Sequence, residues 1–402
     1  MREPIPAFAI GRLPRITFGT GTFANLPAIL DRHGSRAFLV TGGRSFNDSP
    51  RRSELEAGLA EASVTLVGST TVDGEPGPAD VEDPVAAYRG QDVQVVLGVG
   101  GGAALDTAKA IAGLLPVTTE LMDHLEGVGR GVLYPGGALP VVAVPTTAGT
   151  GSEATRNAVI TERGPEGYKR SFRDESMVPA DAVVDPDLLA SAPPSLIAAN
   201  GLDALTQLLE SMTSQRATPV TDALVRDGLA ACRDGLLTWH ADPDGPDAPA
   251  ARSRMAYAAL LSGICLANAG LGAVHGFASP LGAQLPIPHG MACGAVLWQT
   301  IRANITALTE RQPDSPALPK YAEAGRILAG LPSTIRDGAA QVQLVDTLHD
   351  MVEALGVPRL SAFEMTEELI PVVVADSPGS SMRTNPVALT DAELTAILEQ
   401  AL

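Results

Sequence analysis

The chain has 402 residues, of which 45% are hydrophobic, so it is long enough for two or three domains and too apolar to be disordered. Its 46 acidic and 28 basic residues give a formal net charge of -18, which argues against a nucleic-acid surface because phosphate binding needs clustered Lys and Arg. We therefore expect a small-molecule partner.

The N-terminal segment, MREPIPAFAIGRLPRITFG, has an early basic residue but no apolar region followed by a small-residue cleavage site. No uncharged apolar run in the chain reaches the roughly 18 residues that span a bilayer. We therefore expect a cytoplasmic protein without a membrane segment. Within this N-terminal segment, Arg15–Phe18 has the residues of a strand and is a candidate for pairing between subunits.

The first half of the chain alternates short strand-like runs with helical stretches. Residues 37–41 and 93–97 are apolar runs that lead into glycines, which predicts two buried strands. Residues 104–115 form a helical segment rich in Ala and Leu, and residues 140–144 are the next predicted strand. Strand, glycine turn, helix and strand in succession are typical of a parallel α/β sheet, which we assign to residues 1–190.

The second half has a helical pattern. Residues 197–212, 221–239 and 253–269 carry apolar residues at helical spacing. Asp242–Ala250 contains three prolines, which break helices, and is predicted to be a surface loop. We therefore predict that residues 191–402 form an all-helical domain.

Gly100, Gly101 and Gly102 lie between a predicted strand and a predicted helix. Residues without a Cβ let a phosphate approach the backbone, and a helix N-terminus offers free N–H groups and a partial positive charge. The spacing is neither a Walker A pattern nor a clean GxGxxG. A tight turn without a ligand is the alternative interpretation.

A second loop of small residues follows the next predicted strand. Thr146, Thr147, Thr150 and Ser152 bring four hydroxyls that are able to bind a ribose or a phosphate, although Ser152 is also a candidate helix cap. Ligands of open α/β sheets bind at the carboxyl ends of the strands. Two such loops after neighbouring strands therefore favour a nucleotide.

Three side chains in the helical half are candidate metal ligands. Asp203, His275 and His289 offer lone pairs to a divalent metal, and Gln207, one helical turn after Asp203, is a weaker fourth candidate. Taken singly, Asp203 is also a candidate N-cap and His275 a candidate core histidine. Cys232, Cys265 and Cys293 share no CxxC spacing, fit a reducing compartment and are interpreted as small core residues.

In chain order the motifs resemble those of the iron-containing (group III) alcohol dehydrogenase family, in the dehydroquinate synthase-like superfamily. They are GGGAALDTAK, PTTAGTGSEAT, Lys169 in GYKRS, VPADAVVDPDLL, NGLDALTQLLE and VHGFASPLGAQLPIPHG. The resemblance implies a dinucleotide-binding α/β domain over residues 1–190, an all-helical metal and substrate domain over residues 191–402, and a homodimer.

The resemblance also implies roles for individual residues. The cofactor pyrophosphate would rest on Gly100, Gly101 and Gly102, with Asp106 in the helix that follows. Thr146, Thr147 and Ser152 would line the adenosine and ribose side, and Lys169 would lie near the nicotinamide ribose. The metal, Fe2+ or Zn2+, would be held by Asp203, Gln207, His275 and His289.

Two positions depart from the family pattern. Gln207 stands where the family has a His, and its neutral amide oxygen is a weaker ligand, so we expect lower metal affinity. Ser279 stands four residues after His275, where many relatives have a second His that contributes to proton transfer. Proton delivery would then use water or the Ser279 hydroxyl.

The residues after the first predicted strand bear on the choice of cofactor. In dinucleotide folds an acid after a nearby strand binds the ribose hydroxyls and repels a 2'-phosphate. Here Thr41 is followed by Gly42, Gly43 and Arg44, with no carboxylate until Asp48. The sequence therefore predicts NADP(H) in preference to NAD(H), with Gly42 and Arg44 at the cofactor.

The predicted activity is reversible reduction of an aldehyde or ketone to an alcohol with NAD(P)H, assisted by a metal that polarises the carbonyl oxygen. The proposed catalytic residues are Asp203, His275, Ser279 and His289. One alternative is a metal-independent reductase similar to maleylacetate reductase. A dehydroquinate synthase-like lyase would need basic residues that the motifs of the helical half lack, and a non-catalytic dinucleotide-binding protein is the third alternative.

Overall fold

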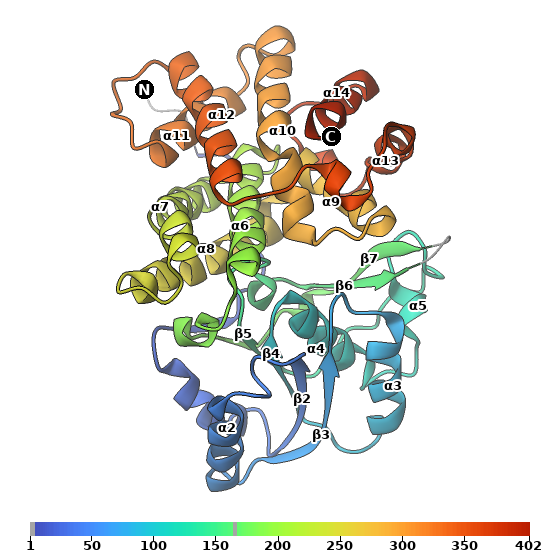
Figure 1. Ribbon diagram of the computed structural model, residues 1–402. Coiled ribbons are helices and arrows are strands. Elements are labelled where there is room, and N and C mark those ends of the chain that lie inside the picture. The colour runs from blue at the N-terminus through green and yellow to red at the C-terminus, as the bar shows by residue number, and fades with distance from the viewer. Residues whose placement is uncertain (1–4, 164–166) are drawn as a thin grey trace. The chain divides into compact units, whose positions relative to one another are not determined.

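The computed structural model describes residues 5–163 and 167–402 (Figure 1). The chain forms two compact units. One spans Gly11–Ser191, and the other contains Ala192–Leu402 with the described residues before Gly11. Each unit has its own secondary-structure class: the first is built on a parallel sheet, and the second is helical.

The sheet of the first unit has six parallel strands in the order β1-β8-β5-β4-β2-β3, which confirms the predicted parallel α/β fold. The strands are β1 (Arg15–Phe18), β2 (Arg36–Gly42), β3 (Thr65–Val72), β4 (Val95–Gly100), β5 (Val141–Pro145) and β8 (Asp181–Val184). The runs predicted at 37–41, 93–97 and 140–144 correspond to β2, β4 and β5, although β4 begins two residues later than predicted.

Both faces of the sheet are covered by helices, which explains why its central strands are apolar on both sides. Alternate residues of β2 enter different cores: Phe38 and Val40 lie in one, and Leu39 lies in the other. The first core is completed by α3 (Pro78–Tyr88) and α4 (Gly102–Leu114), and the second by α1 (Leu26–Asp31) and α2 (Pro50–Glu61). The sheet is therefore doubly wound.

The strand order reverses between β2 and β4. From β2 the chain runs outward to β3, then returns to the opposite side of β2 and continues through β4, β5 and β8. Gly42 ends β2 and Gly100 ends β4, and a Cβ built on Gly100 would lie only 2.9 Å from the backbone nitrogen of Gly42. Ligands of doubly wound sheets bind at this reversal, outside the carboxyl ends of the strands.

A two-stranded antiparallel hairpin, β6 (Asn157–Glu162) with β7 (Tyr168–Arg173), completes the first unit. Phe172 of β7 and Ile160 of β6 enter the same core as α4. A Cβ on Gly113 of α4 would lie 2.9 Å from the Phe172 ring, so glycine permits this approach. The hairpin therefore packs on the helix that begins at the glycine loop.

The second unit contains α6 (Pro194–Thr213), α7 (Pro219–Ala241), α8 (Ala248–Ala269), α9 (Ala273–Gln284), α10 (His289–Arg311), α11 (Ala317–Leu328), α12 (Asp337–Ala354), α13 (Ile370–Asp376) and α14 (Asp391–Ala401). The described part of this unit has no strand, as predicted. Helix α6 is almost wholly buried because α7, α8 and α10 pack around it. Its side chains therefore face other helices rather than solvent.

The loop predicted at Asp242–Ala250 is shorter than expected, since α8 already begins at Ala248. Pro249 occupies the first turn of α8, where a missing N–H costs nothing, so this proline starts a helix rather than breaking one.

No single helix among the described residues has both the length and the apolar composition of a membrane span. Helices α8 and α9 pass that test only as a pair that is bent by 101°.

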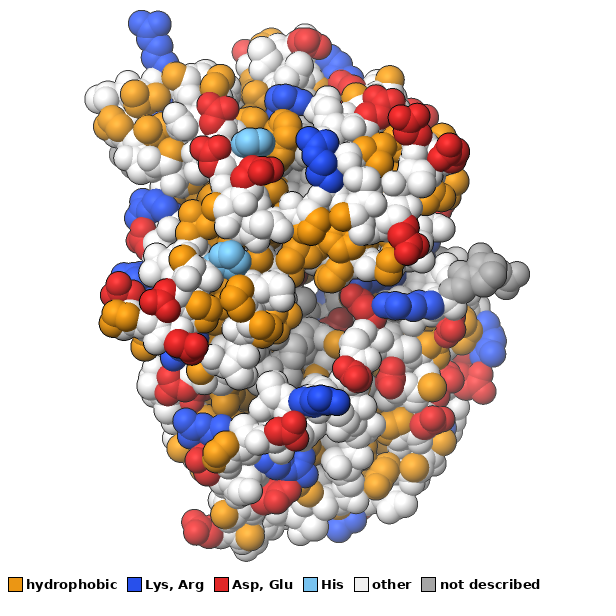
Figure 2. Space-filling view, viewed as in Figure 1, with side chains coloured by type: hydrophobic (Ala, Val, Ile, Leu, Met, Phe, Trp, Pro, Cys, Tyr) orange, Lys and Arg blue, Asp and Glu red, His pale blue; other side chains and the backbone are white. Residues whose placement is uncertain are grey.

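Charged side chains on the face shown in Figure 2 are interspersed, with Lys and Arg scattered among Asp and Glu rather than gathered in a basic patch. This face therefore offers no basic patch of the kind that binds nucleic acid.

Candidate active site

Four side chains of the helical unit direct metal-binding atoms toward one another. They are Asp203 of α6, His275 of α9, and His289 and Cys293 of α10, each with one donor atom within 4.8 Å of the others. His275 Nε2 lies 3.2 Å from Asp203 Oδ1, and His289 Nε2 lies 3.8 Å from the same oxygen. Cys293 Sγ is 3.9 Å from the first imidazole and 4.0 Å from the second.

Helix packing places these donors. His289 is the first residue of α10, and Cys293 follows one turn later on the same face. A Cβ on Gly290 would lie 1.9 Å from the carbonyl oxygen of Ala199, so only glycine allows the start of α10 to approach α6 this closely. That approach brings His289 and Cys293 toward Asp203.

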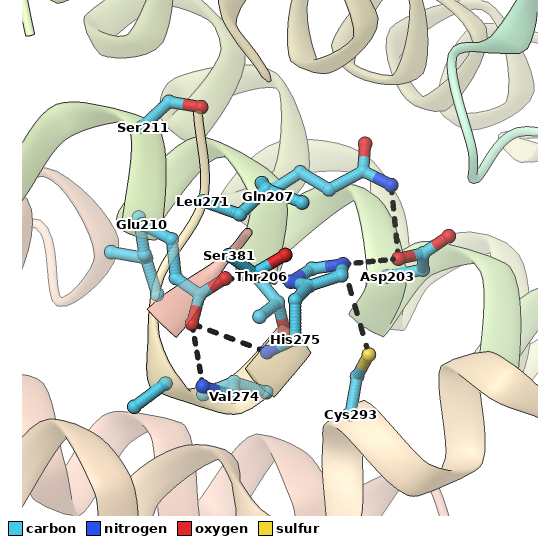
Figure 3. A network of polar contacts seen from close by, with 12 residues as sticks. Asp203, Thr206, Gln207, Glu210, Ser211, Leu271, Val274, His275, Cys293 and Ser381 are labelled. Carbon is cyan, nitrogen blue, oxygen red and sulfur yellow. Dashed lines mark hydrogen bonds and ion pairs between the residues drawn. The ribbon is translucent and has the colours of Figure 1, made fainter. Parts of the chain in front are cut away.

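Glu210 fixes the orientation of His275 (Figure 3). The Nδ1–H of His275 donates to Glu210 Oε2 at 2.6 Å, and the backbone N–H of Val274 donates to Glu210 Oε1 at 2.6 Å. With Nδ1 held as a donor to Glu210, Nε2 points toward Asp203 Oδ1 at 3.2 Å, where it donates a hydrogen bond when protonated and would offer its lone pair to a bound metal. A carboxylate behind a histidine is the usual support of a metal-binding imidazole.

The charges in the cluster favour a bound cation. Burial alone would lower the pKa of His275, but Cys293, Glu210 and Asp203 together raise it well above its usual value. Burial would raise the pKa of Asp203, but the hydrogen bond from His275 and the charge of His289 lower it on balance. Likewise the imidazoles lower the pKa of the Cys293 thiol against the effect of its burial.

The donor set is chemically suited to Fe2+ or Zn2+, which bind carboxylate, imidazole and thiolate. The Nδ1 atom of His289 is buried without a hydrogen-bond partner among the described residues, so no group behind the ring orients it as Glu210 orients His275. We conclude that Asp203, His275 and His289 fit the metal that the sequence predicts.

Gln207 has a different orientation from that expected of a ligand. Its Nε2 donates to Asp203 Oδ1 at 3.0 Å, and its Oε1 accepts a hydrogen bond from Ser262 Oγ at 2.6 Å. The amide oxygen therefore faces Ser262, while the amide N–H orients Asp203, as Figure 3 shows for the Asp203 contact.

Ser279 lies on α9 one turn after His275 and is half-buried. In the part of the chain that the structure describes, no hydrogen bond joins its hydroxyl to the donor cluster. The predicted proton-transfer role of Ser279 stays a prediction.

Cys293 was interpreted as a core residue from the sequence. It is fully buried, but its sulfur faces two imidazoles. The available signal was its spacing of four residues from His289, which places both on one helix face once a helix is known to begin at His289.

In the first unit the predicted phosphate loop and the hydroxyl loop lie side by side. The backbone N–H of Thr146 donates to the carbonyl oxygen of Gly100 at 2.9 Å. A Cβ on Gly101 would lie 3.3 Å from the Thr147 side chain. The structure thus brings together Gly42, Gly100, Gly101, Thr146 and Thr147 at the reversal of strand order.

Asp106 and Ser152, predicted near the cofactor, bond to each other. Ser152 Oγ donates to Asp106 Oδ1 at 2.5 Å, and the Val159 N–H donates to Asp106 Oδ2 at 2.9 Å. The fully buried Lys109 donates to Thr155 Oγ1 at 3.0 Å and pairs with Asp106 at 3.0 Å. These contacts join α4 to the hydroxyl loop and to β6, and so support the shape of the loop.

Gly102 also has a packing role, since a Cβ there would lie 2.6 Å from the Thr150 side chain. Lys169 lies on β7, and its Nζ forms an ion pair of 2.7 Å with Glu75. Its predicted contact with a nicotinamide ribose stays a prediction.

Asp73 is a residue that the sequence analysis did not consider. It directly follows β3, and its Oδ1 lies 3.2 Å from where a Cβ on Gly43 would be. The sequence analysis found no carboxylate close after β2 in the chain, but the structure places one near the end of β2, at the end of the neighbouring strand β3. It was missed because β3 was not predicted.

Glu153, buried beside the hydroxyl loop, gives a pH-dependent prediction. Burial raises the pKa of Glu153 to about 7, so the folded protein binds its proton more tightly than the unfolded chain. Its contribution to stability is full below the unfolded pKa and is lost as pH rises through 7. From pH 5 to pH 8 the free energy of unfolding of the natural protein should therefore fall by roughly 2–3 kcal/mol relative to that of Glu153→Gln, which has no carboxyl to ionise.

Denaturant unfolding of both proteins at the two pH values measures this difference. If the free energies of unfolding of the two proteins changed in parallel from pH 5 to pH 8, the Glu153 carboxyl would already be ionised in the folded state at pH 5, and the prediction would be wrong.

A glycine-lined reversal of a doubly wound sheet, with a buried metal-donor cluster in the same chain, defines the class of dinucleotide-dependent metalloenzymes. Comparison with known proteins identifies the family. The sequence-family model for iron-containing alcohol dehydrogenases matches residues 14–186. The family model for the C-terminal region of Fe-containing alcohol dehydrogenases matches residues 197–402.

Individual relatives agree with this match. The NAD-dependent methanol dehydrogenase of Bacillus methanolicus is 28% identical over 97% of this chain and 98% of its own length. Alcohol dehydrogenase 4 of Saccharomyces cerevisiae is 33% identical over 81% of this chain and 80% of its own. Among solved structures, a 1,3-propanediol oxidoreductase superimposes with a TM-score of 0.87 at 27% identity, covering 99% of this chain and 100% of that one.

The chain belongs to the iron-containing alcohol dehydrogenase family. It is an enzyme that interconverts an alcohol and the corresponding carbonyl compound, so its substrate is a small molecule. Family membership implies a divalent metal and a nicotinamide dinucleotide.

Proposed function

We propose that this protein reduces an aldehyde or ketone with NADPH, using a divalent metal held in the helical domain, residues 191–402. The convergence of Asp203, His275 and His289 on one point carries the proposal. The cofactor is assigned to the α/β domain, residues 1–190, where the glycine and hydroxyl loops meet.

A divalent metal bound at this cluster supplies a Lewis acid for the carbonyl oxygen. Asp203 contributes a negative charge, and Gln207 holds that carboxylate in place through its amide N–H. Glu210 keeps the His275 lone pair directed into the cluster. Ser279, one turn after His275 and half-buried, is the proposed donor of the proton to the alcohol oxygen.

The proposed pyrophosphate site is the N-terminus of α4. Gly101 is the N-cap of this helix, and the first N–H groups of α4 have no partner within the helix. Gly42 and Gly100 keep the approach to these groups free of side chains, while Thr146 and Thr147 flank it. Lys169 is proposed to approach the nicotinamide ribose.

We propose that Arg44 favours NADP(H) by pairing with the 2'-phosphate. Arg44 is exposed two residues beyond Gly42 and forms no ion pair with the described residues. Asp73 acts in the opposite direction, because its carboxylate near Gly43 would repel that phosphate. NAD(H) is the alternative, and the name of the Bacillus methanolicus relative states NAD dependence.

Arg44→Ala tests this preference. A hydrogen bond to a charged group contributes about 1.5–3 kcal/mol, so we expect the Kd of NADPH to rise about 10- to 100-fold. The Kd of NADH should change little in Arg44→Ala. Asp73→Asn should lower the Kd of NADPH. Fluorescence titration measures all of these constants. Faster turnover of the natural protein with NADH than with NADPH would refute the cofactor assignment.

We propose a homodimer in which the edge strand β1 pairs between subunits. Among the described residues, only one edge of β1 has a strand neighbour in the sheet, and Ile16 and Phe18 are 39% and 37% exposed. Exposed apolar edge strands promote association. Sedimentation equilibrium should give a dimer for the natural protein and a monomer for Ile16→Lys, whereas a monomeric natural protein at micromolar concentration would exclude the proposal.

Oxidation of NADPH and NADH in the presence of a panel of aldehydes and ketones tests the proposed function. We expect at least one carbonyl compound to be reduced, and the corresponding alcohol to be oxidised in reverse. Tight NADPH binding with no turnover of any carbonyl compound would contradict the proposal. Turnover that survives complete metal removal would instead support the metal-independent mechanism.

A further inference from the structure

We propose that the thiolate of Cys293 is the fourth protein ligand of the metal, in the place expected for residue 207, and that the resulting site selects zinc over iron. The inference rests on the proposed metal-assisted function and adds a ligand to it. It follows from the orientation of Gln207, the position of the Cys293 sulfur and the chemistry of the resulting donor set.

Both ends of the Gln207 amide are already engaged. The N–H donates to Asp203 Oδ1, and the oxygen accepts from the Ser262 hydroxyl. The reverse amide orientation would set the amide oxygen 3.0 Å from a carboxylate oxygen, two acceptors facing each other. Gln207 therefore positions Asp203 and leaves one place in the donor cluster open to another residue.

Cys293 fills that place geometrically. Zinc bonds of about 2.3 Å to sulfur and about 2.0–2.1 Å to nitrogen give ligand-to-ligand separations of about 3.5 Å at near-tetrahedral angles, and zinc in catalytic sites can expand to five ligands, which would admit the carbonyl oxygen. The sulfur lies 3.9 Å from His275 Nε2 and 4.0 Å from His289 Nε2. A contraction of about 0.5 Å would bring the sulfur to bonding separations from both imidazoles, and all four donor atoms of the cluster already lie within 4.8 Å of one another.

The other two cysteines show that burial alone does not produce this arrangement. Cys232 and Cys265 are also fully buried, but neither is in the donor cluster. The Cys265 sulfur instead contacts the carbonyl oxygen of Thr221 at 3.6 Å. Cys265 is therefore a matched control for Cys293, since both are buried thiols in the helical unit.

A thiolate at this position strengthens the preference of the site for zinc over iron. Thiolate is a soft ligand that suits zinc. The one Asp and three His of the family pattern provide no such ligand, and together they carry a single negative charge. Asp203 and a Cys293 thiolate together carry two negative charges, which balance a divalent ion. This balance within the donor set lowers the cost of burying the ion, while the Glu210 carboxylate behind His275 adds one further negative charge.

X-ray absorption at the zinc edge tests the inference directly. The zinc-loaded natural protein is expected to show one sulfur at about 2.3 Å, with the remaining nitrogen and oxygen ligands at about 2.0–2.2 Å. Cys293→Ser should lose the sulfur, and Cys265→Ser should keep it. Loading the natural protein with cobalt should produce a thiolate-to-cobalt charge-transfer band in the near ultraviolet, which disappears in Cys293→Ser and Cys293→Ala.

The outcomes separate this inference from the proposed function. Stoichiometric metal with only nitrogen and oxygen ligands in the natural protein would overturn the role of Cys293 and leave the metal-assisted function standing. A protein that retains no metal under any loading condition would overturn both. Iron retained in preference to zinc, in a competition with equal amounts of each ion, would overturn the proposed selectivity.

Discussion

Asp203→Ala is expected to lower kcat/KM for aldehyde reduction about a thousandfold or more and to remove most of the bound metal. Asp203 Oδ1 is the atom that both His275 Nε2 and His289 Nε2 approach, at 3.2 Å and 3.8 Å. Lewis-acid assistance contributes several kcal/mol to the transition state, and each 1.36 kcal/mol is tenfold in rate. Steady-state kinetics and elemental analysis of the same preparation measure both effects.

Thr206→Val is the matched control for Asp203→Ala. Thr206 is buried on the same helix, and its hydroxyl donates to the carbonyl oxygen of Leu202 one turn back. The valine is nearly isosteric, so metal content and kcat/KM should stay close to those of the natural protein. Asp203→Ala with undiminished metal content would place the metal elsewhere in the molecule.

Gly101→Ala is expected to raise the Kd of NADPH about 10- to 100-fold. The backbone of Gly101 is extended, with φ -73° and ψ -174°, so alanine fits its conformation. The added methyl would lie 3.3 Å from Thr147 and would occupy the approach to the N-terminus of α4. Because this methyl would keep the pyrophosphate from the backbone N–H groups, the expected loss of affinity corresponds to about 1.4–2.8 kcal/mol of binding free energy.

Gly77→Ala is the control for Gly101→Ala. Gly77 also precedes a helix of the first unit, and a Cβ there would meet its neighbours at ordinary distances of 3.6 Å and 3.7 Å. Fluorescence titration should give an unchanged Kd for this variant. Equal affinity of Gly101→Ala and the natural protein for NADPH would place the pyrophosphate away from this loop.

The central strands and the long helices could be predicted because their apolar patterns are strong. The strands β2, β4 and β5 are apolar runs buried on both faces. By contrast, β3 has the sequence TLVGSTTV and is partly exposed at the edge of the sheet, so it has neither a continuous apolar run nor a regular alternation. Edge strands give weak sequence signals because only part of their surface is buried.

Asp203, His275 and His289 could be proposed as ligands from their residue types together with the order of the family motifs, since each taken singly also has an ordinary structural interpretation. Cys293 could not, because its role depends on where α10 begins and on how closely α10 packs on α6 at Gly290. The orientation of Gln207 depends on Ser262, which lies 55 residues away in the chain. Such contacts between distant residues leave no local pattern in the sequence.

The most direct test of the metal-assisted function is the activity of one preparation before and after metal removal. Protein purified without chelator should reduce an aldehyde with NADPH in proportion to its metal content. Activity should disappear on complete chelation and return when zinc or iron is added to the stripped protein. Full activity in protein that elemental analysis shows to be free of metal would contradict the account.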